Sequence, residues 1–196
     1  LQYTQEQVST RRGMTVLNIA MVGSDDLAKS IAKATDQRDV HTYVNKESGP
    51  DGARILSIIR PAKMPERIRP FFNSLCAARV GLIEVTGVDA TFGEVLVGFA
   101  SAGIQKGIFV INPADGEWID EDQVKGFMTQ AGLSSWKQCS TDGIELREAF
   151  YDLMDEISSD LESAKGEPLV VPIDQHFNVK GIGLVAIGYV QAGSVS

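Results

Sequence analysis

The sequence predicts an α/β fold: a mostly parallel sheet flanked by helices, followed by the first strands of a second, β-rich domain. From Met14 to Ala164, short apolar runs alternate with segments whose apolar residues recur at helical spacing. This alternation is typical of a parallel sheet covered on both faces, and the continuous apolar run Gly107–Ile111 fits a strand buried on both sides. After Lys165 the chain is rich in glycine and β-branched residues without a helical period, which indicates strands of another domain.

Length and composition narrow the classes of protein. The 196 residues suit one domain plus part of another, and 18 Lys and Arg against 26 Asp and Glu give a net charge of −8. That balance argues against nucleic-acid binding driven by overall charge, although it is compatible with a local basic patch. Cys76 and Cys139 fit no zinc or disulfide spacing and indicate a cytoplasmic protein, and no apolar run is long enough to span a membrane.

The chain divides into three expected parts. Residues 1–13 are polar and precede Met14, which favours a leader or tag remnant. Residues 14–164 make up the α/β domain. Residues 165–196 are too few to close a β-barrel, so we expect the first strands of a truncated β-barrel domain.

The same patterns set the expected elements in chain order. In the last helix, apolar residues lie broadly on one face and acidic residues opposite, as in a helix that packs on a sheet. Strands are expected at Val16–Val22, Val40–Val44, Ala53–Arg60, Gly81–Thr86, Lys106–Asn112 and Trp136–Cys139, and later at Leu169–Ile173 and Ile182–Val190. Helices are expected at Leu27–Ala34, Met64–Ala78, Thr91–Ala102, Glu121–Ala131 and Ile144–Leu161.

The segment after the first strand, Gly23–Ser30, reads Gly-Ser-Asp-Asp-Leu-Ala-Lys-Ser and opens a helical pattern. It matches a P-loop, Gly-x-x-x-x-Gly-Lys-Ser/Thr, in which backbone N–H groups, a lysine and a magnesium-bound hydroxyl hold phosphates. Lys29 and Ser30 keep the charge and the hydroxyl, whereas the methyl group of Ala28 crowds a backbone that must turn close to the phosphates. An ordinary strand–turn–helix junction, with one of the two aspartates capping the helix, is the alternative.

Two further motifs follow later strands. Asn112-Pro113-Ala114-Asp115 keeps the two residues with which Asn-Lys-x-Asp motifs read guanine, although the same segment is good turn chemistry at any strand end. Pro113 lacks the aliphatic stem that a lysine lays over the base. Cys139-Ser140-Thr141-Asp142-Gly143-Ile144 matches Ser-Ala-x-x-Gly-x, a turn whose backbone amides face the guanine carbonyl, and it is equally compatible with a helix N-terminal cap.

The segment Pro168–Gly193 has the most specific pattern. It matches Pro-x-x-x-Pro-Ile-x-x-x-Phe-x-x-x-Gly-x-Gly-x-Val-x-x-Gly-x-Val-x-x-Gly at nearly every fixed position. With the preceding motifs in the same order, the chain resembles the translation-factor GTPases of the elongation factor Tu and SelB group over Val16–Ser196. It is most similar to archaeal SelB-like elongation factors, among them the form called EF-Pyl.

The resemblance implies a site for GTP or GDP with Mg²⁺, and aminoacyl-tRNA and the ribosome as partners. It further implies a place in the cytoplasm rather than at a membrane, and it leaves the oligomeric state open. Carried over motif by motif, the residues implied to hold the nucleotide are Gly23, Asp26, Lys29, Ser30, Asn112, Asp115, Ser140 and Thr141. Ser30 would also be the metal ligand.

The catalytic part of the family pattern is missing. The family's third strand ends in Asp-x-Pro-Gly-His, which orders magnesium, senses the terminal phosphate and positions water; here the stretch is Ile59-Arg60-Pro61-Ala62-Lys63. Ile59 cannot hold a cation, and Lys63, charged at neutral pH, is a poor base. Thr42, the available switch threonine, lies inside a strand-like pattern. Because one stabilising group is worth ~10³-fold or more in phosphoryl transfer, we predict no catalytic residue and weak or lost hydrolysis.

Three functions remain open at this point. The first is a SelB-like translation-factor homologue that keeps the fold and the tRNA-facing second domain, with GTP hydrolysis weak or lost. The second is a working GTP-dependent elongation factor with divergent motifs, and the third is an interaction module that keeps only the scaffold. Arg60 and Lys63 are interpreted as solvated basic residues, with a contact to phosphate as the alternative.

Overall fold

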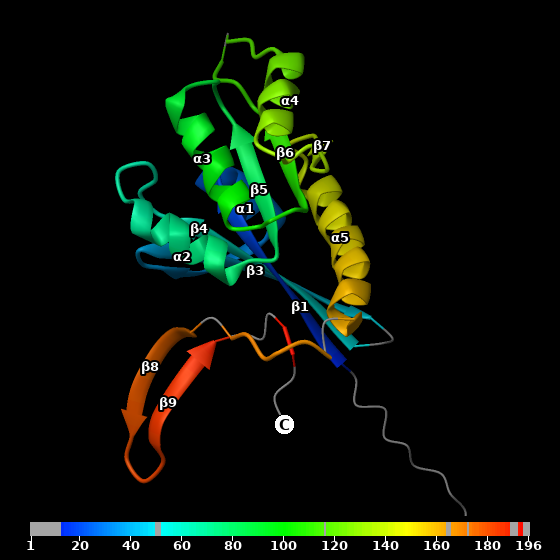
Figure 1. Cartoon of the computed structure of the whole chain (residues 1–196). Coiled ribbons are helices and arrows are strands. Elements are labelled where there is room, and N and C mark those ends of the chain that lie inside the picture. The colour runs from blue at the N-terminus through cyan, green and yellow to red at the C-terminus, as the bar shows by residue number, and fades with distance from the viewer. Residues whose placement is uncertain are drawn as a thin grey trace, which may run out of the picture.

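The computed structural model describes residues 13–49, 52–115, 117–163, 166–171, 173–188 and 192–193. These ranges form a seven-stranded sheet in the order β2-β3-β4-β1-β5-β6-β7 (Figure 1). Strand β3 runs antiparallel to β2 and β4, and the other neighbouring pairs are parallel. The predicted mostly parallel sheet flanked by helices is confirmed. Its strands are β1 (Gly13–Val22), β2 (Lys33–Gln37), β3 (Val40–Gly49), β4 (Gly52–Pro61), β5 (Val80–Val85), β6 (Gly107–Ile111) and β7 (Lys137–Cys139).

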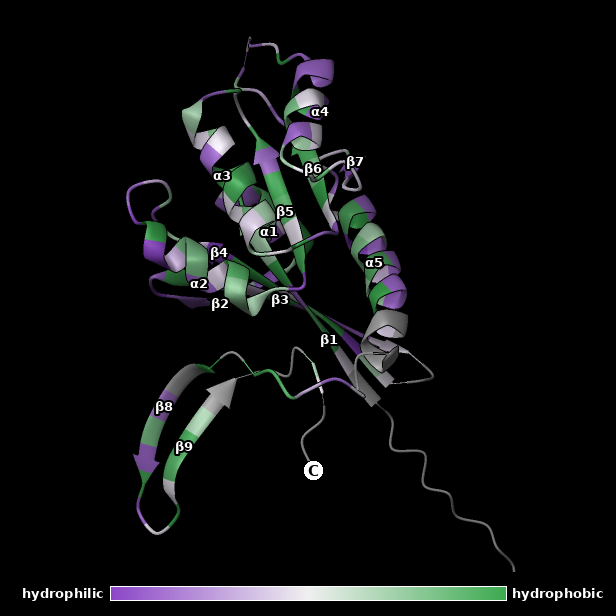
Figure 2. Ribbon diagram, viewed as in Figure 1, coloured by the Kyte–Doolittle hydropathy of each residue, from purple (hydrophilic) through white to green (hydrophobic). Residues whose placement is uncertain are grey.

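Helices cover both faces of the sheet and close two hydrophobic clusters. Alternate residues of a strand point to opposite faces, so Leu82 of β5 packs with residues of α1 and α5, whereas Ile83 packs with residues of α2, α3 and α4. All six residues of β5 are buried, and β5 and β6 are coloured mainly as hydrophobic in Figure 2. The helices are α1 (Asp25–Ile31), α2 (Ile68–Ala77), α3 (Ala90–Ser101), α4 (Glu121–Gln130) and α5 (Gly143–Ser163).

Strand β2 is an element that the sequence pattern did not predict. The expected helix Leu27–Ala34 was wrong at its end, because α1 stops at Ile31 and the following residues pair with β3, with Lys33 opposite Val44. Nearly all of β2 is exposed, so it shows no alternation of apolar and polar residues. The helix expected from Met64 likewise begins only at Ile68, after a series of turns over residues 62–66.

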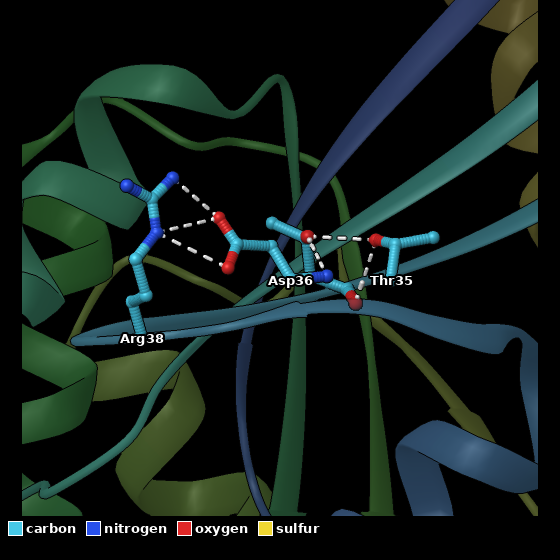
Figure 3. A network of polar contacts seen from close by, with 4 residues as sticks. Thr35, Asp36 and Arg38 are labelled. Carbon is cyan, nitrogen blue, oxygen red and sulfur yellow. Dashed lines mark hydrogen bonds and ion pairs between the residues drawn. The ribbon is translucent and has the colours of Figure 1, made fainter.

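Polar contacts hold the β2–β3 hairpin together (Figure 3). The hydroxyl of Thr35 donates to the carbonyl of Thr42 at 3.0 Å, and the hydroxyl of Thr42 accepts the N–H of Asp36 at 3.2 Å. Arg38 Nε and Nη2 donate to Asp36 Oδ2 at 2.9 and 2.6 Å, and this contact lowers the pKa of Asp36 below its ordinary value. Thr42 therefore lies inside a strand, as predicted, with its hydroxyl engaged by the hairpin.

The C-terminal part contains a separate two-stranded sheet, β8 (Ile173–Val179) and β9 (Gly183–Gly188). The predicted strand Ile182–Val190 corresponds to β9, although Tyr189 and Val190 lie outside the described residues. The predicted strand Leu169–Ile173 was wrong: Val170 forms an isolated bridge with Ala192, and the regular strand starts at Ile173. Continuation into a barrel and the three-part division of the chain stay predictions, and residues 1–12 lie outside the described ranges.

Candidate functional site

The candidate site lies where the carboxyl ends of β1, β5 and β6 approach the start of α1 (Figure 1). In open sheets with parallel strands, ligands bind at this edge. Gly23 and Ser24 follow β1, Glu84 is the penultimate residue of β5, and Asn112 directly follows β6. The fold thus brings together residues that are up to 89 positions apart in the sequence, from Gly23 to Asn112.

Glu84 is the residue at the centre of this site. Its side chain is buried, with a residue exposure of 6%, and its carboxylate accepts hydrogen bonds from two directions. The backbone N–H of Ser24 donates to Oε2, and the side-chain amide of Asn112 donates to Oε1 at 2.6 Å. A Cβ at position 23 would lie 2.8 Å from Glu84 Cβ, so glycine lets the loop pass beside this strand. The anion that this loop amide binds is therefore an internal carboxylate.

Arg60, near the end of β4, fixes the same loop from the other side. Its Nε donates to the carbonyl oxygen of Gly23 at 2.6 Å, and its Nη1 lies 3.4 Å from His41 Nδ1. The interpretation of Arg60 as a solvated basic residue was wrong, because the side chain is half-buried and bound to the backbone. Lys63 is exposed, as that interpretation required.

Most residues of the P-loop motif, from Asp25 to Ser30, lie in a helix. Helix α1 begins at Asp25 and Ser24 is its N-cap, with its hydroxyl accepting the N–H of Leu27 at 3.1 Å. Ala28, which stands at the second glycine position, is fully buried and belongs to the hydrophobic cluster beneath α1 and α5. The alternative of a strand–turn–helix junction is confirmed, with Ser24 rather than an aspartate as the cap.

The ammonium group of Lys29 has a partner within its own helix. It forms an ion pair with the carboxylate of Asp25, four residues earlier, and this carboxylate also accepts a hydrogen bond from the hydroxyl of Tyr43 on β3. The contact with Lys29 first, and that with Tyr43 second, lower the pKa of Asp25 below its ordinary value. The same pair raises the pKa of Lys29. The charge that would meet a phosphate is already balanced.

Ser30 and Asp26 do not form a metal site with other residues in the described part of the chain. The hydroxyl of Ser30 donates to the carbonyl of Leu27 at 2.7 Å, inside the helix, and Asp26 is exposed. Among the described residues, no group of three histidine, cysteine, aspartate or glutamate side chains could hold a metal ion. In this arrangement the backbone N–H of Ser24, the ammonium of Lys29 and the hydroxyl of Ser30 each have a partner within the protein.

The turn after β7 is a helix cap, as one of its two interpretations predicted. Asp142 Oδ1 accepts the N–H groups of Ile144 and Glu145, each at 2.9 Å, and Glu145 reaches back to the N–H of Ser140 at 3.3 Å. Asp142 is thus the N-cap of α5, and its own N–H donates to the hydroxyl of Ser140 at 3.2 Å. The contact with Glu145 engages the amide of Ser140 that the resemblance assigned to guanine.

Of the predicted site residues, Gly23 and Asn112 meet at Glu84. Asp115 and Thr141 are exposed, and their roles in guanine recognition stay predictions. The sequence reasoning missed Glu84 as a site residue. Its signal was present, because it is the one charged residue inside the otherwise apolar segment Gly81–Val85.

Comparison with known proteins agrees with this architecture. No family model matches the chain. An uncharacterized protein of Methanocaldococcus jannaschii, MJ0325, is 25% identical over 183 residues, which are 93% of this chain and 55% of that protein. The chain therefore spans about half the length of the curated relative that it matches.

Two solved structures of elongation factors have a similar fold. The bacterial selenocysteine-specific elongation factor EF-Sec matches with a TM-score of 0.59 and 23% identity, over 91% of this chain and 34% of that one. SelB from Methanococcus maripaludis, in complex with the GTP analogue GPPNHP, matches with a TM-score of 0.55 and 18% identity, over 92% and 42%. At these identities the likeness is one of fold. The chain therefore shares its fold with a part of these two elongation factors.

Proposed function

We propose that this chain is part of a SelB-like translation-factor homologue whose α/β domain has the GTPase fold, with GTP hydrolysis weak or lost. Its partners would be aminoacyl-tRNA and the ribosome, in the cytoplasm where translation factors act. Within the described residues, no helix has the length and apolar character needed to cross a membrane. The single observation behind the proposed loss of turnover is the double hydrogen bond of Glu84 to Ser24 and Asn112.

A phosphate group would have to compete with this internal carboxylate. It would need the N–H of Ser24, which donates to Glu84, and the ammonium of Lys29, which is paired with Asp25. A hydrogen bond to a charged group contributes about 1.5–3 kcal/mol, so giving up the contact of Ser24 with the buried Glu84 would weaken nucleotide binding by roughly tenfold to a hundredfold. The first turn of α1 would also have to unwind to form a loop around the phosphates.

The segment that follows α1 supports the same proposal. It is a hairpin closed by its own hydrogen bonds between Thr35, Asp36 and Thr42, so none of these contacts depends on a nucleotide. Tyr43 ties this hairpin to Asp25 in the first turn of α1. A domain with these connections would keep one conformation whether or not GTP is present.

Isothermal titration with GTP and with GDP, each with and without Mg²⁺, tests the proposal. We expect no binding in the micromolar range, with the Methanococcus maripaludis SelB as a positive control. Micromolar, magnesium-dependent binding with multiple turnovers would favour the working GTP-dependent factor instead. In that case the changes Lys29→Ala and Asp115→Asn should each abolish binding.

The proposed tRNA partner is tested separately from the nucleotide. Filter binding of aminoacylated and deacylated tRNA to the full-length protein should show a preference for the aminoacylated form. Equal and negligible binding of both would favour the third possibility, an interaction module that keeps only the scaffold.

A further inference from the structure

A shallow hollow lined by basic residues lies beside helices α1 and α5, and Glu84 is not among the residues that line it. It has a volume of about 560 Å³ and lies between the end of α1, the start of β2, β3 and the first turns of α5. Three basic residues line it, Lys29, Lys33 and Arg147, together with Asn45 and the apolar residues of 31–34. In the part of the chain that the structure describes, no acidic residue lines it, although the chain has eight more acidic than basic residues.

The three cations differ in how firmly they are held. Arg147 Nη1 donates to the carbonyl oxygens of Ser30 and Ile31, each at 3.0 Å, which fixes the guanidinium against the end of α1. Lys29 is held by Asp25, which does not line the hollow. Lys33 is exposed and has no ion-pair partner among the described residues. The hollow therefore presents one fixed cation, Arg147, and one exposed cation, Lys33, whereas a phosphate at Lys29 would have to compete with Asp25.

We propose that this hollow binds the phosphate backbone of RNA. A site for a small phosphorylated ligand needs preorganised polar groups in an enclosed pocket, whereas the lysines here are exposed and end in flexible ammonium groups. No aromatic residue is among the described residues that line the hollow, so we expect the contacts to go to phosphates rather than to stacked bases. This inference rests on the proposed function only in taking RNA as the partner class.

The acidic character of the whole chain does not prevent such a contact. At physiological ionic strength, charges more than about 8 Å away are largely screened, so the local cations decide the interaction with a bound phosphate. Two phosphate contacts to a single strand, at Arg147 and Lys33, predict a slope of about −1.4 in a plot of log affinity against log salt concentration.

The test compares two double variants with the same change in charge. Lys29→Gln with Lys33→Gln removes two cations of the hollow. Lys125→Gln with Lys63→Gln removes two exposed lysines elsewhere, and Lys125 is matched to Lys29 because it also pairs with an acid four residues earlier. Affinity for a single-stranded RNA and for tRNA is measured by filter binding with the whole chain at several salt concentrations.

We expect the hollow variant to bind about threefold more weakly and to reduce the salt slope by about 0.7, because Lys33 is its one lysine without an ion-pair partner among the described residues, with little change in the control. Equal loss in both double variants, or an unchanged slope in the hollow variant, would overturn the inference but leave the proposed translation role intact. Polyglutamate at equal charge and micromolar tripolyphosphate are added as competitors of the bound RNA. If either one displaces the RNA completely, the assignment to RNA is overturned. If the unmodified chain binds no RNA, both this inference and the proposed tRNA partner fail.

Discussion

Replacing Glu84 by alanine tests the central contact of the site. The change removes both acceptor oxygens and leaves the N–H of Ser24 and the amide of Asn112 without their partner. Two hydrogen bonds to a charged group, at about 1.5 kcal/mol each, predict a loss of about 3 kcal/mol in the free energy of unfolding. Urea denaturation followed by circular dichroism measures this difference. Glu84→Gln should lose less, because it keeps one acceptor and Asn112 can turn its amide.

The matched control is Glu94→Ala on α3, since Glu94 is exposed and the change has the same size and charge. Exposed substitutions of this kind shift stability by less than about 0.5 kcal/mol. If Glu84→Ala were as mild as Glu94→Ala, the carboxylate would not be the anion that holds the loop after β1. The argument that it competes with phosphate would then be refuted.

Two further changes probe the surroundings of α1. Because Lys29 lowers the pKa of Asp25 below its ordinary 3.8, the ionised carboxylate stabilises the fold above that pH, and this contribution is lost as the pH falls through the lower folded value. Asp25→Asn should therefore flatten the decline of the urea midpoint below about pH 4, and an unchanged decline would exclude the ion pair. Gly143→Ala would place a Cβ against the carbonyl oxygen of Ser30 and should cost about 2 kcal/mol in thermal or urea unfolding. Gly126→Ala on α4, with nothing within 4 Å, should instead stabilise by about 0.5–1 kcal/mol, so equal effects would contradict the close packing of α5 on α1.

The order of strands and helices could be predicted because hydrophobic periodicity records which faces are buried. Strand β6 is apolar throughout and β5 is apolar except for Glu84, and the structure buries both strands between helices. Strand β2 escaped prediction for the same reason, since it lies at the sheet edge and is largely exposed. Its pairing with β3 comes from backbone hydrogen bonds and from the contacts of Thr35 and Thr42, which leave no hydrophobic pattern.

The location of the candidate site could be predicted from the sequence, but the hydrogen bonds within it could not. The motif placed Gly23 and Asn112 at the ends of strands that the structure brings to the same edge. The start of α1 could not be read from the sequence, because Ser24 and the aspartates after it are all good N-caps. The choice depends on Glu84, 60 residues away, which accepts the N–H of Ser24. A single carboxylate in an apolar strand indicates that a hydrogen-bond partner is needed, but the sequence does not show which residue that partner is.

Both glycine positions of the P-loop pattern can be explained by packing alone. Gly23 matches the pattern, and a Cβ there would lie 2.8 Å from Glu84 Cβ, so the passage of the chain beside β5 already requires glycine. Ala28 departs from the pattern, and its methyl group lies fully buried in the cluster beneath α1 and α5, where a glycine would leave a void. The glycine at position 23 and the alanine at position 28 can therefore both be explained by the packing of this segment against the sheet. It follows that the resemblance at this motif supports a shared fold more strongly than it supports a shared nucleotide, and that the titration with GTP must decide between them.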